Sequence, residues 1–136
     1  MSDAFPVVIF HNPACETSRN TLAMIRASGV EPAVVDYLKT GWLLSQLHDL
    51  LALTELTPRQ LLREKGTPAA ELGLLDSAVP DEAILAAMVE HPVLVNRPIV
   101  LTARGARLCR PSERVFALLE TPPASFTKED GEVVRP

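Results

Sequence analysis

Cysteine, histidine and long apolar runs are all scarce in this sequence. Its 136 residues include two cysteines and three histidines, whose spacing matches no metal site. Free thiols are expected here rather than a structural disulfide. No apolar run approaches the roughly 20 residues needed to span a bilayer, and residues 1–5 lack the basic and apolar regions of a signal peptide. We therefore predict a cytoplasmic protein without a membrane partner.

Basic residues are also too few to indicate binding driven by charge alone. The sequence has 13 Lys and Arg against 17 Asp and Glu, a net charge of -4, which argues against a nucleic-acid partner. A local basic pocket is compatible with this balance. Hydrophobic residues make up 47% of the chain, there is no internal repeat, and the length fits one core. We predict a single domain over residues 1–136.

Apolar periodicity and turn residues predict the order of elements along the chain. Strands are predicted at 7–10, 33–37, 99–102 and 106–109, and helices at 17–27, 42–53, 58–63, 80–90 and 111–119. A short helical piece is also predicted between Gly66 and Gly73. The first two strands should pair in parallel across a helix, and the last two should form a hairpin. The Pro-containing tail should be loosely ordered.

This order of elements is that of a thioredoxin-like α/β fold. Its mixed four-stranded sheet would be interrupted by a helical insertion at about residues 42–91. Pro98 lies directly before the third strand, where that fold has a cis-proline facing the reactive thiol. A cis bond at Pro98 is a hypothesis from the sequence, since few X-Pro bonds are cis.

Cys15 lies between a predicted buried strand and the start of a helix. The free N–H groups and the positive dipole end of a helix favour a thiolate there, and the thiolate is the nucleophilic form. Ser18 stands where the dithiol version of this Cys-x-x-Ser pattern would have a resolving cysteine. An outside thiol must therefore complete any redox cycle.

Two residues near this segment allow alternative roles. An imidazolium at His11 would stabilise the thiolate or order the loop, whereas a histidine that hydrogen-bonds the loop backbone is an equally good interpretation. Cys109 lies in a predicted strand. A packed thiol is the favoured interpretation of this second cysteine.

Three arginines adjoin these segments: Arg63, Arg97 and Arg110. A guanidinium has a fixed fork of donors that suits a tetrahedral oxyanion, and in a thioredoxin-like layout Arg97 and Arg110 should project near Cys15. Such a site would serve attack on phosphate or arsenate. The alternative is surface arginines paired with the abundant carboxylates, and spacing alone favours that alternative.

Several segments together resemble the glutaredoxin-linked arsenate reductases. They have the patterns HNPxCxxSRNTL at 11–22, NRPIV at 96–100 and RLCRPSE at 107–113, with further similarity at 61–63 and 71–74. The match runs in order over nearly the whole chain. The resemblance implies a thioredoxin-like fold with extra helices, and reduction of arsenate to arsenite with glutathione as co-substrate, glutaredoxin as partner and no bound cofactor.

The resemblance also implies roles for single residues. Cys15 corresponds to the cysteine that forms an arseno-cysteine adduct, and His11 to the residue thought to favour its thiolate. Arg63, Arg97 and Arg110 correspond to the arginines that hold the arsenic oxyanion or its glutathionylated adduct. Cys109 corresponds to a nearby cysteine that is not the nucleophile.

Two positions depart from the family pattern, and two other functions are compatible with the fold. Glu16 stands where small or neutral residues are familiar, so its charge should oppose both the thiolate and the oxyanion. Residues 40–44 lack the prolines and charges often seen there. The first alternative function is a regulator that contacts RNA polymerase, although such regulators commonly have Cys-x-x-Cys. The second is a general glutathione-dependent thiol reductase.

Overall fold

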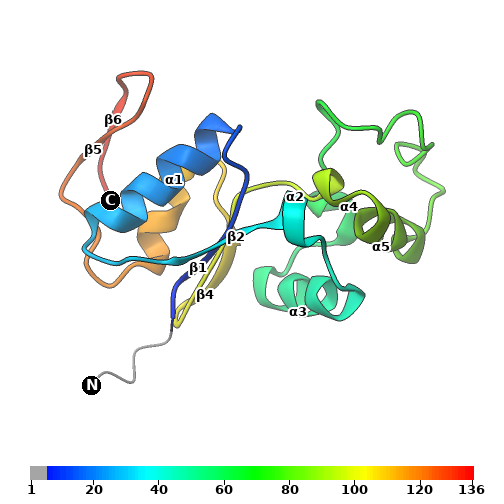
Figure 1. Cartoon of the computed structure of the whole chain (residues 1–136), viewed down its shortest axis with the longest axis horizontal. Coiled ribbons are helices and arrows are strands. Elements are labelled where there is room, and N and C mark those ends of the chain that lie inside the picture. The colour runs from blue at the N-terminus through cyan, green and yellow to red at the C-terminus, as the bar shows by residue number, and fades with distance from the viewer. Residues whose placement is uncertain (1–5) are drawn as a thin grey trace. The chain divides into compact units, whose positions relative to one another are not determined.

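A mixed four-stranded sheet organises the part of the chain that contains both cysteines. The computed structural model describes residues 6–136, and the sheet has the order β2-β1-β3-β4 (Figure 1). Its strands are β1 (Val8–His11), β2 (Ala33–Asp36), β3 (Ile99–Thr102) and β4 (Gly105–Leu108). β1 pairs with β2 in parallel and with β3 antiparallel, and β3 pairs antiparallel with β4. The predicted thioredoxin-like α/β fold is confirmed.

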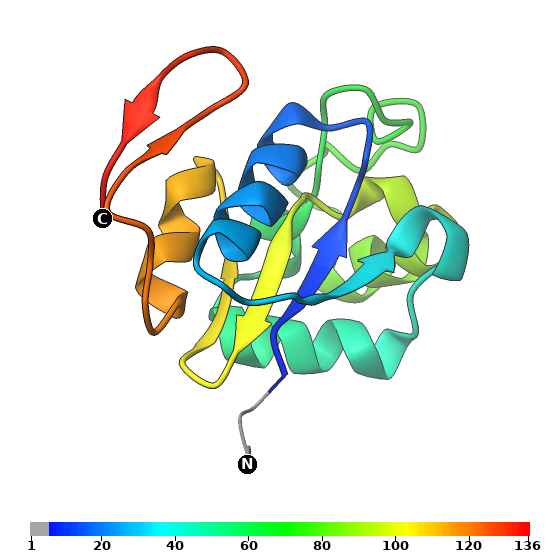
Figure 2. The same ribbon diagram turned by 60° about the vertical axis from the view of Figure 1, so that its left-hand side comes forward.

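Helices α1 (Glu16–Ala27) and η2 (Ser112–Leu118) pack on this sheet and on each other (Figure 2). Met24 and Ile25 of α1 lie in a buried cluster with Ile9 of β1 and Val100 of β3. α1 ends at Ala27, and Gly29 adopts a positive φ of 91° that favours glycine. η2 is a 3₁₀ helix, in which each N–H donates to the carbonyl three residues earlier. An α-helix was predicted for 111–119.

The chain divides into two compact units, 1–36 with 97–136, and 37–96. The second unit contains five short helices: α2 (Tyr37–Thr40), α3 (Leu44–Thr54), α4 (Pro58–Leu61), α5 (Asp81–Glu90) and η1 (Pro92–Leu94). The single-domain organisation with an insertion at about 42–91 stays a prediction. Residues 1–5, from which we predict that a signal peptide is lacking, lie outside the described residues. Within 6–136, no helix is long and apolar enough to cross a membrane.

The prediction was wrong for two helical pieces of the second unit. α4 ends at Leu61, because the extended Leu62 forms a bridge with Val95 and the Arg63 N–H donates to the Leu94 carbonyl at 2.7 Å. Thr57 caps the start of α4, where its side chain accepts from the Gln60 N–H. Residues 66–73 form successive turns and not a helix.

The tail after residue 120 is ordered, contrary to the prediction. Strands β5 (Phe126–Thr127) and β6 (Val133–Val134) form an antiparallel hairpin. Phe126 and Val134 pack against the buried cluster of the first unit. This burial stabilises a segment whose local sequence, rich in proline and charge, does not indicate a strand.

The cis-proline hypothesis is confirmed. The Arg97–Pro98 bond is cis, and so is the Arg110–Pro111 bond, which the sequence analysis did not anticipate. Arg97 and Arg110 thus each directly precede a cis-proline.

Candidate active site

Cys15 occupies the N-cap position of α1, one short loop after β1. We call residues 12–15 the Cys15 loop. Within it, the Asn12 side-chain oxygen accepts from the Ala14 N–H at 2.9 Å, and the Asn12 carbonyl accepts from the Cys15 N–H at 3.0 Å. These two bonds close a tight turn that directs the chain into the helix. The thiol is 9% exposed, so it is shielded on most sides.

The sheet brings two arginines to this thiol. β1 and β3 are antiparallel with Phe10 opposite Ile99, and β3 and β4 are antiparallel with Ile99 opposite Leu108. The end of β1, the start of β3 and the end of β4 therefore meet at one edge of the sheet. Arg97 and Arg110 flank those strand ends.

The Arg110 guanidinium lies directly beside the Cys15 sulfur. Its Nη1 is 3.7 Å from the sulfur and also donates to the Arg97 carbonyl at 3.0 Å. The Arg97 side chain hydrogen-bonds to Cys15 as well. The structure therefore brings together Cys15, Arg97 and Arg110, three of the residues selected from the sequence. Their roles toward an oxyanion stay predictions.

The surroundings of Cys15 lower the pKa of its thiol to about 7. Burial alone would raise this pKa, but the Arg97 side chain, the Ser18 backbone N–H and the Arg110 side chain all favour the thiolate and together prevail. At neutral pH about half of the thiol is therefore ionised. A thiolate beside two guanidinium groups is a nucleophile with donors in place for an anionic substrate.

His11 contacts Ser18 and not the sulfur. Its Nδ1 lies 2.6 Å from Ser18 Oγ, which also accepts from the Asn12 N–H at 3.1 Å. Burial lowers the pKa of His11, although Asp36 opposes the effect, so the neutral imidazole is favoured at pH 7. The thiolate-activating role of His11 stays a prediction, and any such effect would pass through Ser18. The sequence pattern indicates Ser18 only as the replacement of a resolving cysteine and does not reveal its contact with His11.

Arg63 belongs to the second unit. Its Nε donates to the Lys65 carbonyl at 3.1 Å, and its Nη1 lies 3.5 Å from Asn96 Oδ1. Its proposed contact with an oxyanion stays a prediction.

Cys109 is a packed core residue. It is fully buried within the cluster of the first unit, and burial raises the pKa of its thiol to about 12. A thiol that remains protonated at physiological pH is a poor nucleophile. These properties support the interpretation that Cys109 is structural.

One residue near the thiol was missed by the sequence analysis. Arg19, on the first turn of α1, donates from Nη1 to the Pro13 carbonyl of the Cys15 loop at 2.9 Å. The same guanidinium donates twice to Glu129 of the tail hairpin. Its position one residue after Cys-x-x-Ser was a signal of proximity, but the partner 110 residues away could not be read from the sequence.

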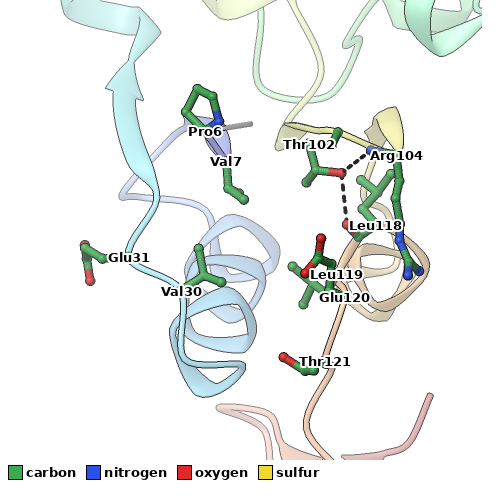
Figure 3. A pocket seen from close by; sticks show the side chains of 11 residues that line it. Pro6, Val7, Val30, Glu31, Thr102, Arg104, Leu118, Leu119, Glu120 and Thr121 are labelled. Carbon is green, nitrogen blue, oxygen red and sulfur yellow. Dashed lines mark hydrogen bonds between the residues drawn. The ribbon is translucent and has the colours of Figure 1, made fainter. Parts of the chain in front are cut away.

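A pocket in the first unit lies at the other end of the sheet from Cys15 (Figure 3). Its volume is about 300 Å³, and Val7 and Thr102 line it, at the start of β1 and the end of β3. The Thr102 hydroxyl in this pocket already forms two hydrogen bonds: it donates to the Leu118 carbonyl and accepts from the Arg104 N–H (Figure 3). This pocket is therefore separate from the thiol site. Within residues 6–136, no group of three or more His, Cys, Asp or Glu side chains could hold a metal ion.

Comparison with known proteins identifies the family. The sequence model of the ArsC family matches residues 10–118. An arsenate reductase of Rhizobium meliloti is 57% identical over 129 residues, which cover 94% of this chain and 92% of that protein. An arsenate reductase of Escherichia coli strain K12 is 48% identical over 129 residues, which again cover 94% of this chain and 92% of that protein. The structure of an arsenate reductase from Vibrio cholerae superposes with a TM-score of 0.81 at 42% identity, covering 86% of this chain and 100% of that one. The chain belongs to the ArsC family.

Proposed function

We propose that this protein is a cytoplasmic arsenate reductase, with Cys15 as its nucleophile. The observation that carries the proposal is the position of the Cys15 thiol at a helix N-terminus, with the Arg110 guanidinium 3.7 Å away and the Arg97 side chain hydrogen-bonded to it. The names of the relatives agree with this chemistry. Arsenate is a tetrahedral oxyanion, and planar forks of N–H donors suit its oxygens.

The first step is attack of the Cys15 thiolate on arsenic. A sulfur–arsenic bond forms, an arsenic–oxygen bond breaks, and the released oxygen takes up protons and leaves as water. Arg97 and Arg110 neutralise the negative charge of the substrate and of the transition state. Donors fixed in advance, as the Arg110 contact to the Arg97 carbonyl fixes this guanidinium, need little reorganisation during the reaction.

The second half of the cycle requires thiols from outside the chain. Glutathione attacks arsenic in the adduct, so that a second sulfur–arsenic bond forms and a second oxygen leaves as water. A glutaredoxin thiolate then attacks the glutathione sulfur, the bond from that sulfur to arsenic breaks with its electron pair left on arsenic, and a mixed disulfide of glutathione and glutaredoxin forms. Two thiols lose two electrons, arsenic gains them and passes from the +5 to the +3 state, and hydrolysis releases arsenite and Cys15. Glutaredoxin resolves the mixed disulfide. Ser18 stands at the resolving position and Cys109 is buried in the core, so neither supplies a second reactive thiol.

The test is arsenate turnover by the purified protein with glutathione and glutaredoxin, measured as arsenite formed. Wild-type protein should turn over, and omission of glutathione should stop the reaction. Cys15→Ser should be inactive, because a hydroxyl is a much weaker nucleophile. Reduction of a small disulfide at a comparable rate without arsenate turnover would favour the general thiol reductase instead. Capture of RNA polymerase by a protein without either activity would favour the regulator.

A further inference from the structure

Lys128 fixes the tail hairpin to η2 of the first unit. We call residues 128–132 the hairpin tip. Lys128, whose side chain is 10% exposed, forms ion pairs with Glu113 of η2 at 2.7 Å and with Glu132 at 3.0 Å. The turn itself is closed by the Gly131 N–H, which donates to the Lys128 carbonyl at 2.9 Å, and Gly131 has a positive φ of 94°. The tip is therefore an ordered structure with a defined position.

The tip contacts the first turns of α1 through Glu129. Arg19 donates to both carboxylate oxygens of Glu129, from Nε at 2.9 Å and from a terminal nitrogen at 3.0 Å. The Glu129 backbone N–H also donates to Asn20 Oδ1 at 3.0 Å. A bidentate pair of this kind fixes the orientation of the guanidinium plane, and a single contact would not.

The remaining terminal nitrogen of Arg19 donates to the Pro13 carbonyl at 2.9 Å. Pro13 lies within the Cys15 loop, two residues before the nucleophile. A continuous set of hydrogen bonds therefore runs from the hairpin tip through Glu129 and Arg19 to the loop that presents the thiol. The hairpin lies beyond residues 10–118, the part of the chain that the family model covers.

We propose that Glu129 is a positioning residue for the reaction of Cys15, because it holds Arg19 on the Pro13 carbonyl and so fixes the Cys15 loop. This inference deepens the proposed function and rests on it for the activity readout. Glu129 does not touch the substrate. Its effect passes through Arg19 and the loop to the direction in which the thiolate approaches arsenic.

The same helix provides a matched control. Arg26 in the last turn of α1 pairs with Glu31 in a similar fork, with Nε at 3.2 Å and Nη2 at 3.0 Å from the carboxylate. Both ion pairs are exposed on the surface. Within residues 6–136, Arg26 forms no hydrogen bond to the Cys15 loop, and it lies at the other end of the helix. Glu31→Ala therefore removes a comparable ion pair without reaching the thiol.

The first experiment compares Glu129→Ala with Glu31→Ala in arsenate turnover. A loosened loop should lower kcat about three- to tenfold, well below the roughly hundredfold loss that a full 1 Å displacement of a reacting group can cause. KM for arsenate should change by less than about twofold, because Arg97 and Arg110 remain. Glu31→Ala should match wild type. Equal effects of the two variants, or a loss confined to KM, would overturn the proposal.

A charge exchange separates positioning from general stabilisation of the hairpin. The double variant Arg19→Glu/Glu129→Arg restores an ion pair between hairpin and helix, but a glutamate at position 19 cannot donate to the Pro13 carbonyl. Thermal stability should recover toward wild type while kcat stays low. Recovery of kcat together with stability would mean that the hairpin only stabilises the fold.

A readout without arsenate keeps this inference distinguishable from the proposed function. In Glu129→Ala, loss of a nearby negative charge would by itself lower the pKa of Cys15, whereas a loosened loop weakens the bonds to its sulfur and raises that pKa. We expect the midpoint of Cys15 alkylation by iodoacetamide to move to higher pH. A downward or absent shift refutes the positioning role. If the alkylation midpoint of Glu129→Ala moves to higher pH but wild-type protein does not turn over arsenate, the proposed function is refuted and the positioning role of Glu129 stands.

Discussion

The ionisation of Cys15 offers the most direct test of the site, because the fraction of thiolate sets the rate at which Cys15 is alkylated. With its pKa at about 7, half of the thiol is reactive at pH 7. An ordinary thiol with a pKa of about 8.5 would be about 3% ionised at that pH, so the site should increase the thiolate population roughly 16-fold. Alkylation of wild-type protein should therefore have its half-maximal rate near pH 7.

Substitution of the arginines tests the cause of this shift. Burial alone raises the pKa of Cys15, so Arg97→Ala should move the alkylation midpoint toward or beyond the ordinary value and slow alkylation at pH 7. Arg110→Ala should act in the same direction but less, because the Arg97 hydrogen bond contributes more to the lowered pKa.

The assay is iodoacetamide labelling followed by mass spectrometry, at a series of pH values from about 5 to 10. Cys109 is an internal control, since burial raises the pKa of its thiol to about 12 and it should stay unlabelled in folded protein. A midpoint at or above about 8.5, the usual value for a free cysteine, would refute activation by these neighbours. Labelling of Cys109 before Cys15 would refute the assignment of the nucleophile.

Three further outcomes follow from the same geometry. Cys15→Ser should abolish arsenate turnover with an unchanged circular dichroism spectrum, whereas Cys109→Ala should keep most activity and instead lower the unfolding temperature through its buried position. Arg110→Lys should lower kcat/KM about tenfold to hundredfold, since loss of one charge-assisted bond is worth roughly 1.5–3 kcal/mol and lysine lacks the fork; an unchanged kcat/KM in steady-state assays would contradict this. Although burial opposes it, the Lys128 partner lowers the pKa of Glu113, so this pair should stabilise the protein above the unfolded pKa of about 4.3 and lose its effect as pH falls through the lower native pKa. Urea unfolding from pH 7 to pH 3 should show this loss in wild type and not in Glu113→Gln.

Local sequence signals were sufficient for the sheet and for the thiol. Strand β1, the loop residues after it and the helix pattern of α1 are contiguous, so their order alone placed Cys15 at a helix start. Arg97 and Arg110 were predicted near the thiol only through the expected topology. The two arginines come close to Cys15 because β1 pairs with β3 and β3 pairs with β4. From the sequence, these pairings follow only if the predicted fold is correct.

Contacts between distant segments account for what the sequence did not predict. α4 ends before Arg63 because Leu62 pairs with Val95, 33 residues further along the chain. The tail hairpin depends on burial of Phe126 and Val134 and on the ion pair of Lys128 with Glu113. No window of local sequence contains both members of these pairs, so propensity and periodicity could not reveal them.

The Ser18 N–H that lowers the pKa of Cys15 also links the chemistry to the stability of α1. Ser18 is the third residue of the helix, and its N–H belongs to the first turn, where amides lack partners within the helix. A bond that favours the thiolate must by linkage be weaker once the sulfur is protonated or bonded to arsenic. The interaction between the Ser18 N–H and the thiolate therefore weakens when the sulfur bonds to arsenic and returns when the thiolate is regenerated. In the alkylated protein the amides of residues 16–18 should exchange with solvent faster than in the thiolate form, while the amides near Ala27 keep their rate.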